Sequence, residues 1–427
     1  EFAGAVLRDD KAVALVAVTQ NGVALEFAGA ALQGDHGVAL AAVRSNGLAL
    51  KFVAAALFDD VDLQVAAVQQ DGSAFQFVAQ AHRSNPLVLR AAVQSAALRN
   101  DRAFVLDAVK RHGQILEFLA ATWQGDREIA MAAVKQDGLA LKFVAAALHR
   151  EIAMAAVKQN GLALKFVAAA LRRDVDVHVA AVQQNGFAFH LVAPAMKSHP
   201  RVLQAAVQSS ALCSNRAFIL DAVTSRGQIL EFAETWQSDC EIALAAVGQD
   251  GLALKFVAAA LLDDVDLQAA AVQQNGLALE LVAPAHKGDF RVLRAAVQSA
   301  ARRNDRDFIL GAVRQHGRLL EFVAAFWKSD HGIALAAVMQ DGLALEFVAS
   351  PLLEDTDLSA AAVQQNGFAL QFVAPAQRVE PRILRIALQS AALRSDRGFV
   401  LDAVGRHGQL LELVDPAWRN DRDIVLA

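Results

Sequence analysis

The side chains of this sequence with the clearest chemical potential are glutamines that recur just before a glycine, as in the stretch VQQNG at residues 182–186. One interpretation is a polar ladder that binds a ligand along one edge of the molecule. The other is that each amide bonds backbone groups at its own turn or the adjacent one, because carbonyl groups at helix ends need partners. We favour the second interpretation. Gln20 and Gln315 occupy the same position before the turn. The glutamines predicted to bond the turns are Gln70, Gln136, Gln159, Gln184, Gln249, Gln274, Gln340 and Gln365.

Histidine fills the position before the glycine in three other copies, at His112, His316 and His407, and Arg226 fills it in a fourth. A metal ligand would not be exchanged for arginine, whereas a positive charge at a helix C-terminus is favoured by the helix dipole. The pattern therefore predicts that these histidines bind no metal.

Four tryptophans replace the leucine that ends most repeats, and the last three are 91 residues apart. One interpretation is that they anchor a partner peptide or pigment along a groove. The other, which we favour, is that they fill space left by a shortened repeat nearby, because a void is costly. Two lysines form a basic patch that favours an acidic partner. The residues assigned to partner contact are Trp123, Trp236, Trp327, Trp418, Lys142 and Lys165.

Motifs for catalysis do not stand out. No nucleophile with a nearby base, no carboxylate pair and no phosphate-binding glycine loop is recognised. Cys213 and Cys240 lack the neighbours of a zinc motif or a disulfide framework, and are expected to be semi-buried thiols. The sequence therefore predicts a protein that is not an enzyme and has no cofactor. A weak alternative is an enzyme with a site on the concave face, which buried carboxylates or histidines of perturbed pKa would favour.

Composition limits the class of protein further. The 427 residues are 55 % hydrophobic and 20 % charged, which is typical of a folded, core-rich chain. The net charge is −5, and the 40 basic and 45 acidic residues are interspersed, so the basic footprint of a nucleic-acid binder is missing. No apolar run reaches the ~18 residues of a membrane helix, so we expect no membrane insertion.

The elements that position these side chains are repeats of about 25 residues. The run LALKFVAAAL occurs at 48–57, 139–148 and 252–261, each time directly after a glycine. Most of these glycines are 25 residues apart, and four gaps are 41 residues. The predicted turn glycines are Gly22, Gly47, Gly72, Gly113, Gly138, Gly161, Gly186, Gly227, Gly251, Gly276, Gly317, Gly342, Gly367 and Gly408.

Each gap of 41 residues contains a shortened unit that keeps the pattern AxQS and lacks the glycine turn. These units lie at 91–101, 205–215, 295–305 and 386–396, which gives a higher period of about 91 residues. We expect one continuous solenoid over residues 1–427. Its super-repeats are 1–35, 36–126, 127–239 with a duplicated unit at 150–172, 240–330, 331–421, and the start of another at 422–427.

Within the unit SDCEIALAAVGQDGLALKFVAAALLDD, the first helix is predicted from its cap and its apolar spacing. Asp239 is a favourable N-cap, and Glu241 complements the helix dipole. Ile242, Ala245 and Ala246 follow the i, i+3, i+4 spacing of a buried helix face.

The second helix is predicted from the turn onwards. Gly251 is expected to end the first helix in a left-handed conformation, and Asp250 then caps the second helix. Its inner stripe is predicted to be Leu252, Phe256 and Ala259–Ala260. Each helix has only ~10 residues and would be marginal alone in water, so stacking must stabilise it. We therefore expect an all-α fold, an α-solenoid of short antiparallel helix pairs in a right-handed superhelix.

The repeated pattern D-x-x-[IV]-x-x-A-A-V-x-Q-[DN]-G-x-A-L-x-F-[AV] resembles domain of unknown function 4116, a repeat of algae and some bacterial pathogens. The resemblance covers essentially the whole chain. Phenylalanine stands where that family often has tyrosine, and every fourth unit is shortened. The resemblance implies a helical repeat, and it implies no reaction and no catalytic residues.

We therefore expect a scaffold whose extended surface binds a protein partner. The main alternative is a structural subunit that assembles end to end or braces a large multi-protein complex. The first residues, EFAGA, match the middle of a second helix at Glu26–Ala30, and the last, NDRDIVLA, stop within a first helix. Because natural solenoids end in polar capping repeats, we expect that this chain is a segment of a longer repeat array, or that its open ends pair with further copies of itself.

Overall fold

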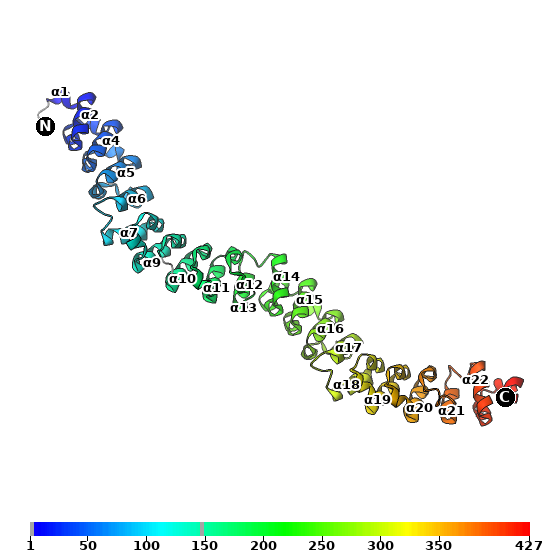
Figure 1. Ribbon diagram of the computed structural model, residues 1–427. Helices are drawn as coiled ribbons and strands as arrows, with labels where there is room; N and C mark the ends of the chain where they lie inside the picture. The colour runs from blue at the N-terminus through cyan, green and yellow to red at the C-terminus, as the bar shows by residue number, and fades with distance from the viewer. Residues whose placement is uncertain (1–3, 146–148) are drawn as a thin grey trace. The chain divides into compact units, whose positions relative to one another are not determined.

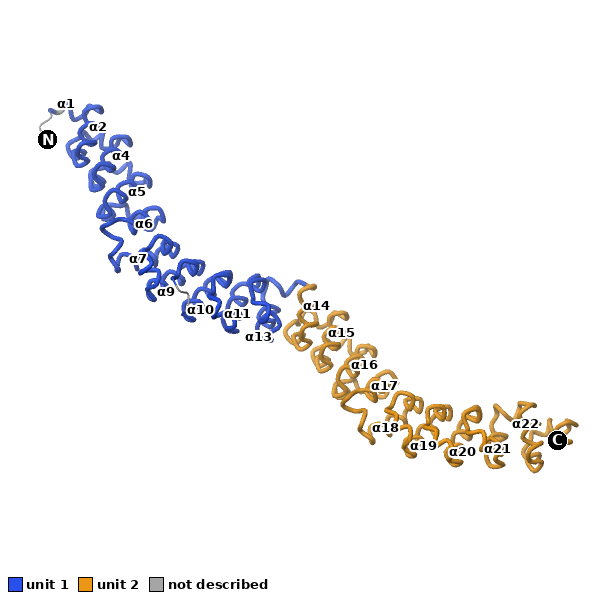
Figure 2. The backbone as a smooth tube through the Cα atoms, in the orientation of Figure 1, with its two compact units in different colours: residues 1–215 blue, residues 216–427 orange. Residues whose placement is uncertain are grey.

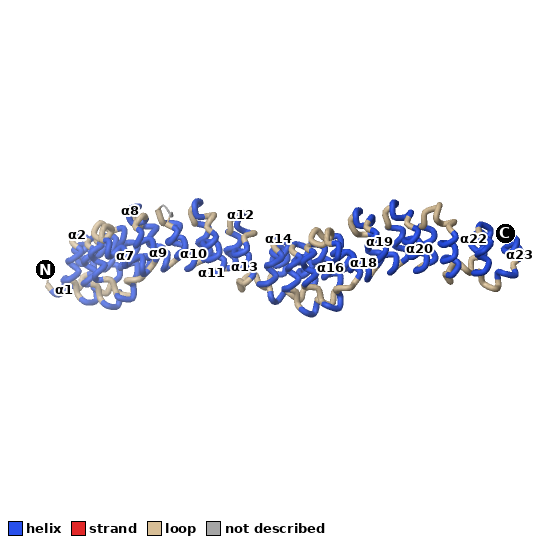
Figure 3. The backbone as a smooth tube through the Cα atoms, turned by 90° about the horizontal axis from the view of Figure 1, so that it is seen from below, coloured by secondary structure: helices blue, strands red, loops and turns tan. Residues whose placement is uncertain are grey.

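The structure is a computed structural model that describes residues 4–145 and 149–427. Within these ranges every regular element is a helix, and no strand occurs (Figure 3). The prediction of an all-α repeat fold is therefore confirmed. The chain divides into two compact units, residues 1–215 and residues 216–427 (Figure 2). The expected single solenoid across both units stays a prediction.

The α-helices of the first unit follow one another along the chain, and full-length neighbours such as α9 and α10 pack side by side (Figure 1). They are α1 Ala5–Arg8, α2 Lys11–Gln20, α3 Ala30–Gln33, α4 His36–Ser45, α5 Val61–Gln70, α6 Pro86–Gln94, α7 Arg102–Arg111, α8 Ala121–Gln124, α9 Arg127–Gln136, α10 Arg150–Gln159, α11 Val175–Gln184, α12 Pro194–Lys197 and α13 Pro200–Val207.

The second unit repeats this order. Its α-helices are α14 Arg216–Ser225, α15 Cys240–Gln249, α16 Val265–Gln274, α17 Phe290–Gln298, α18 Arg306–Gln315, α19 His331–Gln340, α20 Thr356–Gln365, α21 Pro381–Gln389, α22 Arg397–Arg406 and α23 Arg422–Leu426.

The first helix of a unit forms as predicted. In α15 the Asp239 carboxylate accepts hydrogen bonds from the backbone N–H of Glu241 and of Ile242, both at 3.1 Å. Ile242 and Ala246 are fully buried, whereas Ala245 is only half-buried. The cap and the apolar spacing therefore define this helix, with the buried face turned slightly from the predicted one.

The second helix of a unit differs from the prediction, because it is a 3-10 helix of five or six residues and not an α-helix of about ten. In the segment Gly251–Phe256, the Ala253 N–H bonds the Asp250 carbonyl at 2.8 Å, and Val257 then bonds Leu254 at 3.2 Å. All of these helices begin at a predicted turn glycine. They span Gly22–Phe27, Gly47–Phe52, Gly72–Phe77, Gly113–Phe118, Gly138–Phe143, Gly161–Phe166, Gly186–Leu191, Gly227–Phe232, Gly251–Phe256, Gly276–Glu280, Gly317–Glu321, Gly342–Phe347, Gly367–Phe372 and Gly408–Leu413.

The remaining short 3-10 helices connect one repeat of about 25 residues to the next repeat. They are Ala55–Leu57, Gln80–His82, Ala169–Leu171, Glu234–Trp236, Ala259–Leu261, Pro284–His286, Ala325–Ser329, Ser350–Glu354 and Trp418–Asn420.

The buried face of the second helix also differs from the predicted one. Three residues per turn place Leu254 and Val257 on the same side, and both are buried. Leu252 and Phe256 are half-buried, and Ala259–Ala260 is exposed. The predicted inner stripe is therefore wrong, because it assumed the period of an α-helix.

The turn glycines are required for close approach and not for a left-handed backbone. No glycine of the chain has a positive φ in the left-handed range, so that part of the prediction is wrong. The bend lies at the preceding residue, such as Asp250, which is extended with φ −144° and ψ 107°. A Cβ at Gly251 would overlap the carbonyl oxygen of Ala271 in the next unit and lie 3.0 Å from the Cβ of Asn275. Gly408 has no atom within 4 Å of such a Cβ.

Candidate functional site

The glutamines before the turns join each repeat of about 25 residues to the preceding repeat. The Oε1 atom of Gln274 accepts a hydrogen bond from the backbone N–H of Gly251 at 2.5 Å, and its Nε2 donates to the Gln249 carbonyl at 3.0 Å. The other predicted glutamines accept from a turn glycine in the same way. The pairs are Gln70–Gly47, Gln136–Gly113 (2.6 Å), Gln159–Gly138 (2.7 Å), Gln184–Gly161 (2.5 Å), Gln249–Gly227 (2.5 Å), Gln340–Gly317 (2.5 Å) and Gln365–Gly342 (2.6 Å).

These bonds use the acceptor end of every one of the eight amides, so little of the row is left for a ligand. In the shortened units a serine takes the glutamine position. Ser95 donates its hydroxyl to the Ala92 carbonyl at 2.7 Å and lies against Gly72. The smaller side chain closes the turn locally, where no second helix follows.

A second row of contacts lies at the opposite end of the first helices and was not foreseen from the sequence. Eight first helices begin with a basic residue that contacts the N-cap aspartate of the next repeat. The pairs are Lys11–Asp35 (2.6 Å), His36–Asp60 (2.9 Å), Arg102–Asp126 (3.2 Å), Arg150–Asp174 (2.5 Å), Arg216–Asp239 (2.9 Å), Arg306–Asp330 (2.8 Å), His331–Asp355 (2.9 Å) and Arg397–Asp421 (2.7 Å).

The ion pair is the main cause of the lowered pKa of Asp239 in this row. The hydrogen bond from Arg216 lowers the pKa of the Asp239 carboxyl, and the backbone N–H of Ile242 lowers it further, while partial burial acts in the opposite direction. Exposed ion pairs contribute about 0–1 kcal/mol each. The row therefore sets the register between units, and its perturbed carboxylates need no catalytic explanation.

One buried polar position was also missed. His178 in α11 is 2 % exposed, and its Nε2 lies 2.8 Å from the Arg172 carbonyl. Gln64 and Gln268 hold the same helix position in α5 and α16, and each donates to a carbonyl six residues earlier in the chain. In these three helices the side chain at this position bonds the connection between repeats, and histidine serves there as an alternative to glutamine.

Three of the four tryptophans donate an indole N–H hydrogen bond to a backbone carbonyl of a shortened repeat. All four are half-buried, and Trp327 packs against the core of the second unit. In three of them the indole N–H is bonded within the chain and is not available to a partner. The bonds are Trp123–Arg99 (3.0 Å), Trp327–Arg303 (2.8 Å) and Trp418–Arg394 (3.0 Å), each to the carbonyl oxygen.

The two lysines assigned to partner contact lie on the 3-10 helices. The Nζ atom of Lys142 is 4.3 Å from the centre of the Phe143 ring, and that of Lys165 is 4.6 Å from the Phe166 ring. Such cation–π contacts hold a side chain along its own helix with about 0.5–1 kcal/mol. These lysines are exposed, but each already has a partner.

The histidines before the turns bond loops of the preceding unit. The Nε2 of His316 lies 2.8 Å from the Gly288 carbonyl, and that of His407 lies 2.7 Å from the Val379 carbonyl. Cys213 is half-buried as expected, whereas Cys240 at the start of α15 is exposed. Within residues 4–145 and 149–427, no three His, Cys, Asp or Glu side chains gather as metal ligands would. No helix in this part of the chain is long and apolar enough to cross a membrane.

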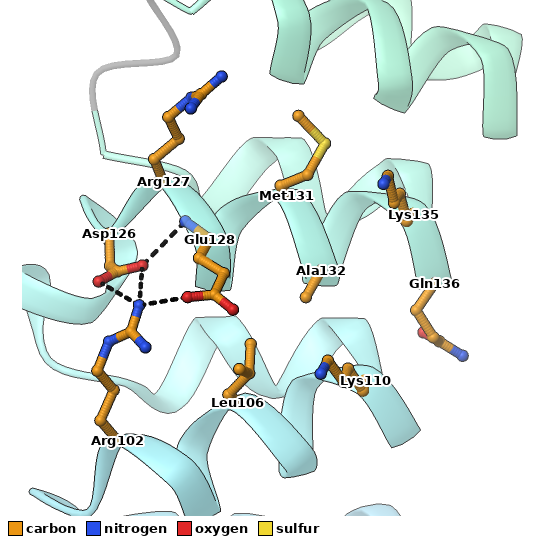
Figure 4. A pocket seen from close by; sticks show the side chains of 10 residues that line it. All are labelled: Arg102, Leu106, Lys110, Asp126, Arg127, Glu128, Met131, Ala132, Lys135 and Gln136. Carbon is orange, nitrogen blue, oxygen red and sulfur yellow. Dashed lines mark hydrogen bonds and ion pairs between the residues drawn. The ribbon is translucent and has the colours of Figure 1, made fainter.

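On the outer face of the first helices, between these two rows of contacts, neighbouring helices enclose shallow grooves. The groove between α7 and α9 has a floor of Leu106, Met131 and Ala132 (Figure 4). At one end Arg102 binds Asp126 and Glu128, and at the other end Lys110 and Lys135 lie together (Figure 4). Similar grooves lie between α4 and α5 and between α18 and α19.

Comparison with known proteins gives one match. The family model described as Domain of unknown function (DUF4116) matches residues 101–147, 149–197 and 215–262. The expected family resemblance is confirmed over these three segments. No curated protein and no solved structure matches the chain.

Proposed function

We propose that this repeat protein is a non-enzymatic scaffold that presents the outer face of its first helices to a protein partner. The observation that supports this proposal is the distribution of internal bonds. Several first helices, such as α19, are bonded at both ends, by the basic residue–aspartate row at one end and by the glutamine–glycine row at the other. The outer face between them carries grooves that recur in both units. A face that repeats at each helix offers an extended surface without a single deep site.

The experiment is crosslinking of the purified chain in an extract of its source cells, followed by mass spectrometry of the crosslinked peptides. We expect partner crosslinks on the outer faces of α7, α9 and α19 and few on the 3-10 helices. Sedimentation velocity over a range of concentrations gives a second readout. Partner crosslinks confined to other surfaces would contradict the proposal. A sedimentation coefficient that grows with concentration, with crosslinks only between copies, would favour the structural subunit instead.

A further inference from the structure

We infer that α7, α9 and α10 form a docking site for an acidic protein segment that carries large apolar side chains. The inference rests on the proposed scaffold function and names the partner's chemistry. The fifth residue of each helix supplies an apolar floor of Leu106, Met131 and Met154, all half-buried. Methionine side chains adapt to differently shaped partners, which suits a docking floor.

A row of lysines borders this floor. The ninth residue of each helix is Lys110, Lys135 and Lys158, and all three are exposed. None of them forms an ion pair within the part of the chain that the structure describes. The nearest acid on α7, Asp107, is already bound by Arg111 at 2.7 Å. In a chain of net charge −5, three adjacent cations that form no ion pair point to an acidic ligand.

The opposite border of the groove distinguishes a peptide from a nucleic acid. The arginines that begin these helices are bound to carboxylates: Arg102 to Asp126 and Glu128, and Arg150 to Asp174. Bidentate phosphate binding would need free guanidinium groups. Because packed helices lie about 8–10 Å apart, the lysine row spans roughly 20 Å, which about six extended residues would cover.

The test uses the full chain and two double variants that reverse the same number of charges. Lys135→Glu with Lys158→Glu alters the row, and Lys51→Glu with Lys255→Glu, two exposed lysines on the 3-10 helices, is the matched control. A display library of random peptides of about 12 residues, long enough to span the row, is selected against the wild-type chain. The recovered peptide is then titrated into each variant by fluorescence anisotropy. Thermal unfolding must match the wild type in both variants.

We expect recovered peptides rich in Asp or Glu beside Leu, Ile or Phe. Their affinity should fall roughly tenfold or more in the Lys135/Lys158 variant and stay within about twofold in the control. Peptides without acidic residues, or an equal loss in both variants, would overturn the site. So would tighter binding of single-stranded oligothymidylate at the same lysines. If no peptide is recovered while crosslinking still finds a partner, this site fails and the scaffold proposal stands.

Discussion

The glutamine row makes a quantitative prediction at Gln274. Replacing it with alanine removes the acceptor, at 2.5 Å, for the N–H of Gly251, which is buried. A buried donor without a partner costs about 1–3 kcal/mol. The Gln249 carbonyl, which loses a 3.0 Å bond, lies at an exposed residue and can bond water instead, so it adds little. Alanine returns a few tenths of a kcal/mol of helix propensity.

The expected net loss is about 1–2 kcal/mol, confined to the junction between two units. A stack of repeats does not unfold in one step, so a global midpoint is a poor readout. We would measure amide hydrogen exchange by mass spectrometry on peptides that span Gly251. Exchange should accelerate by roughly 5- to 30-fold, since about 1.4 kcal/mol is a factor of ten. Peptides several units away should be unaffected.

The adjacent Gln273 provides the control. It is exposed and forms no side-chain hydrogen bond within the described residues. Gln273→Ala should leave exchange at Gly251 unchanged, and Gln274→Glu, which keeps the acceptor and loses the donor, should give an intermediate effect. If Gln274→Ala and Gln273→Ala accelerate exchange equally, the amide does not join the units and the reasoning is refuted.

Three further predictions concern other parts of the repeat. Gly251→Ala should destabilise the junction between its repeat and the next by about 3 kcal/mol, because the added Cβ would overlap backbone atoms, whereas Gly408→Ala should be neutral or slightly stabilising. Equal effects of the two variants on local hydrogen exchange would contradict this. The folded-state pKa of Asp239 is lowered, so its contribution is present above the unfolded pKa of about 3.9 and is lost as pH falls through the folded pKa. Protection from hydrogen exchange at the start of α15, corrected for the intrinsic exchange rate at each pH, should thus drop less below about pH 4 in Asp239→Asn than in the wild type. His178→Gln should keep wild-type protection, because Gln268 serves the same position. His178→Ala should lower local stability by about 1–3 kcal/mol, measured by hydrogen exchange of peptides that span Arg172 and His178.

The local sequence of a unit contains enough information for its caps and turns, but not for the type of its second helix. Asp239 and the turn at Gly251 follow from residue preferences that act over three or four positions. The run LALKF satisfies an α-helix and a 3-10 helix equally well, because apolar residues fill nearly every position. The close approach of Gly251 to the next unit, which no local pattern contains, accompanies the tighter helix.

Contacts between units were the harder part of the candidate site. The basic residue–aspartate row depends on residues 24 apart, such as Arg306 and Asp330. A signal was present, because aspartate is followed by a basic residue at the start of many first helices. It was ambiguous, since the same dipeptide is expected at any helix N-terminus. The sequence alone does not separate the lysine row from other lysines such as Lys142 and Lys165, because only the structure shows that the rings of Phe143 and Phe166 hold those two side chains.

The repeat separates residues that hold the stack from residues free to vary. The ends of the first helix are constrained, because each contact there reaches the neighbouring unit. Within the described residues, no side chain at the ninth position of that helix bonds a neighbouring repeat. This residue changes from Lys135 and Lys158 in residues 1–215 to Thr224 and Gly248 in residues 216–427. Substitution at this position should change what binds while leaving stability near its wild-type value, whereas substitution at Gln274 should do the reverse. A repeat built this way can change its outer face without rebuilding its fold.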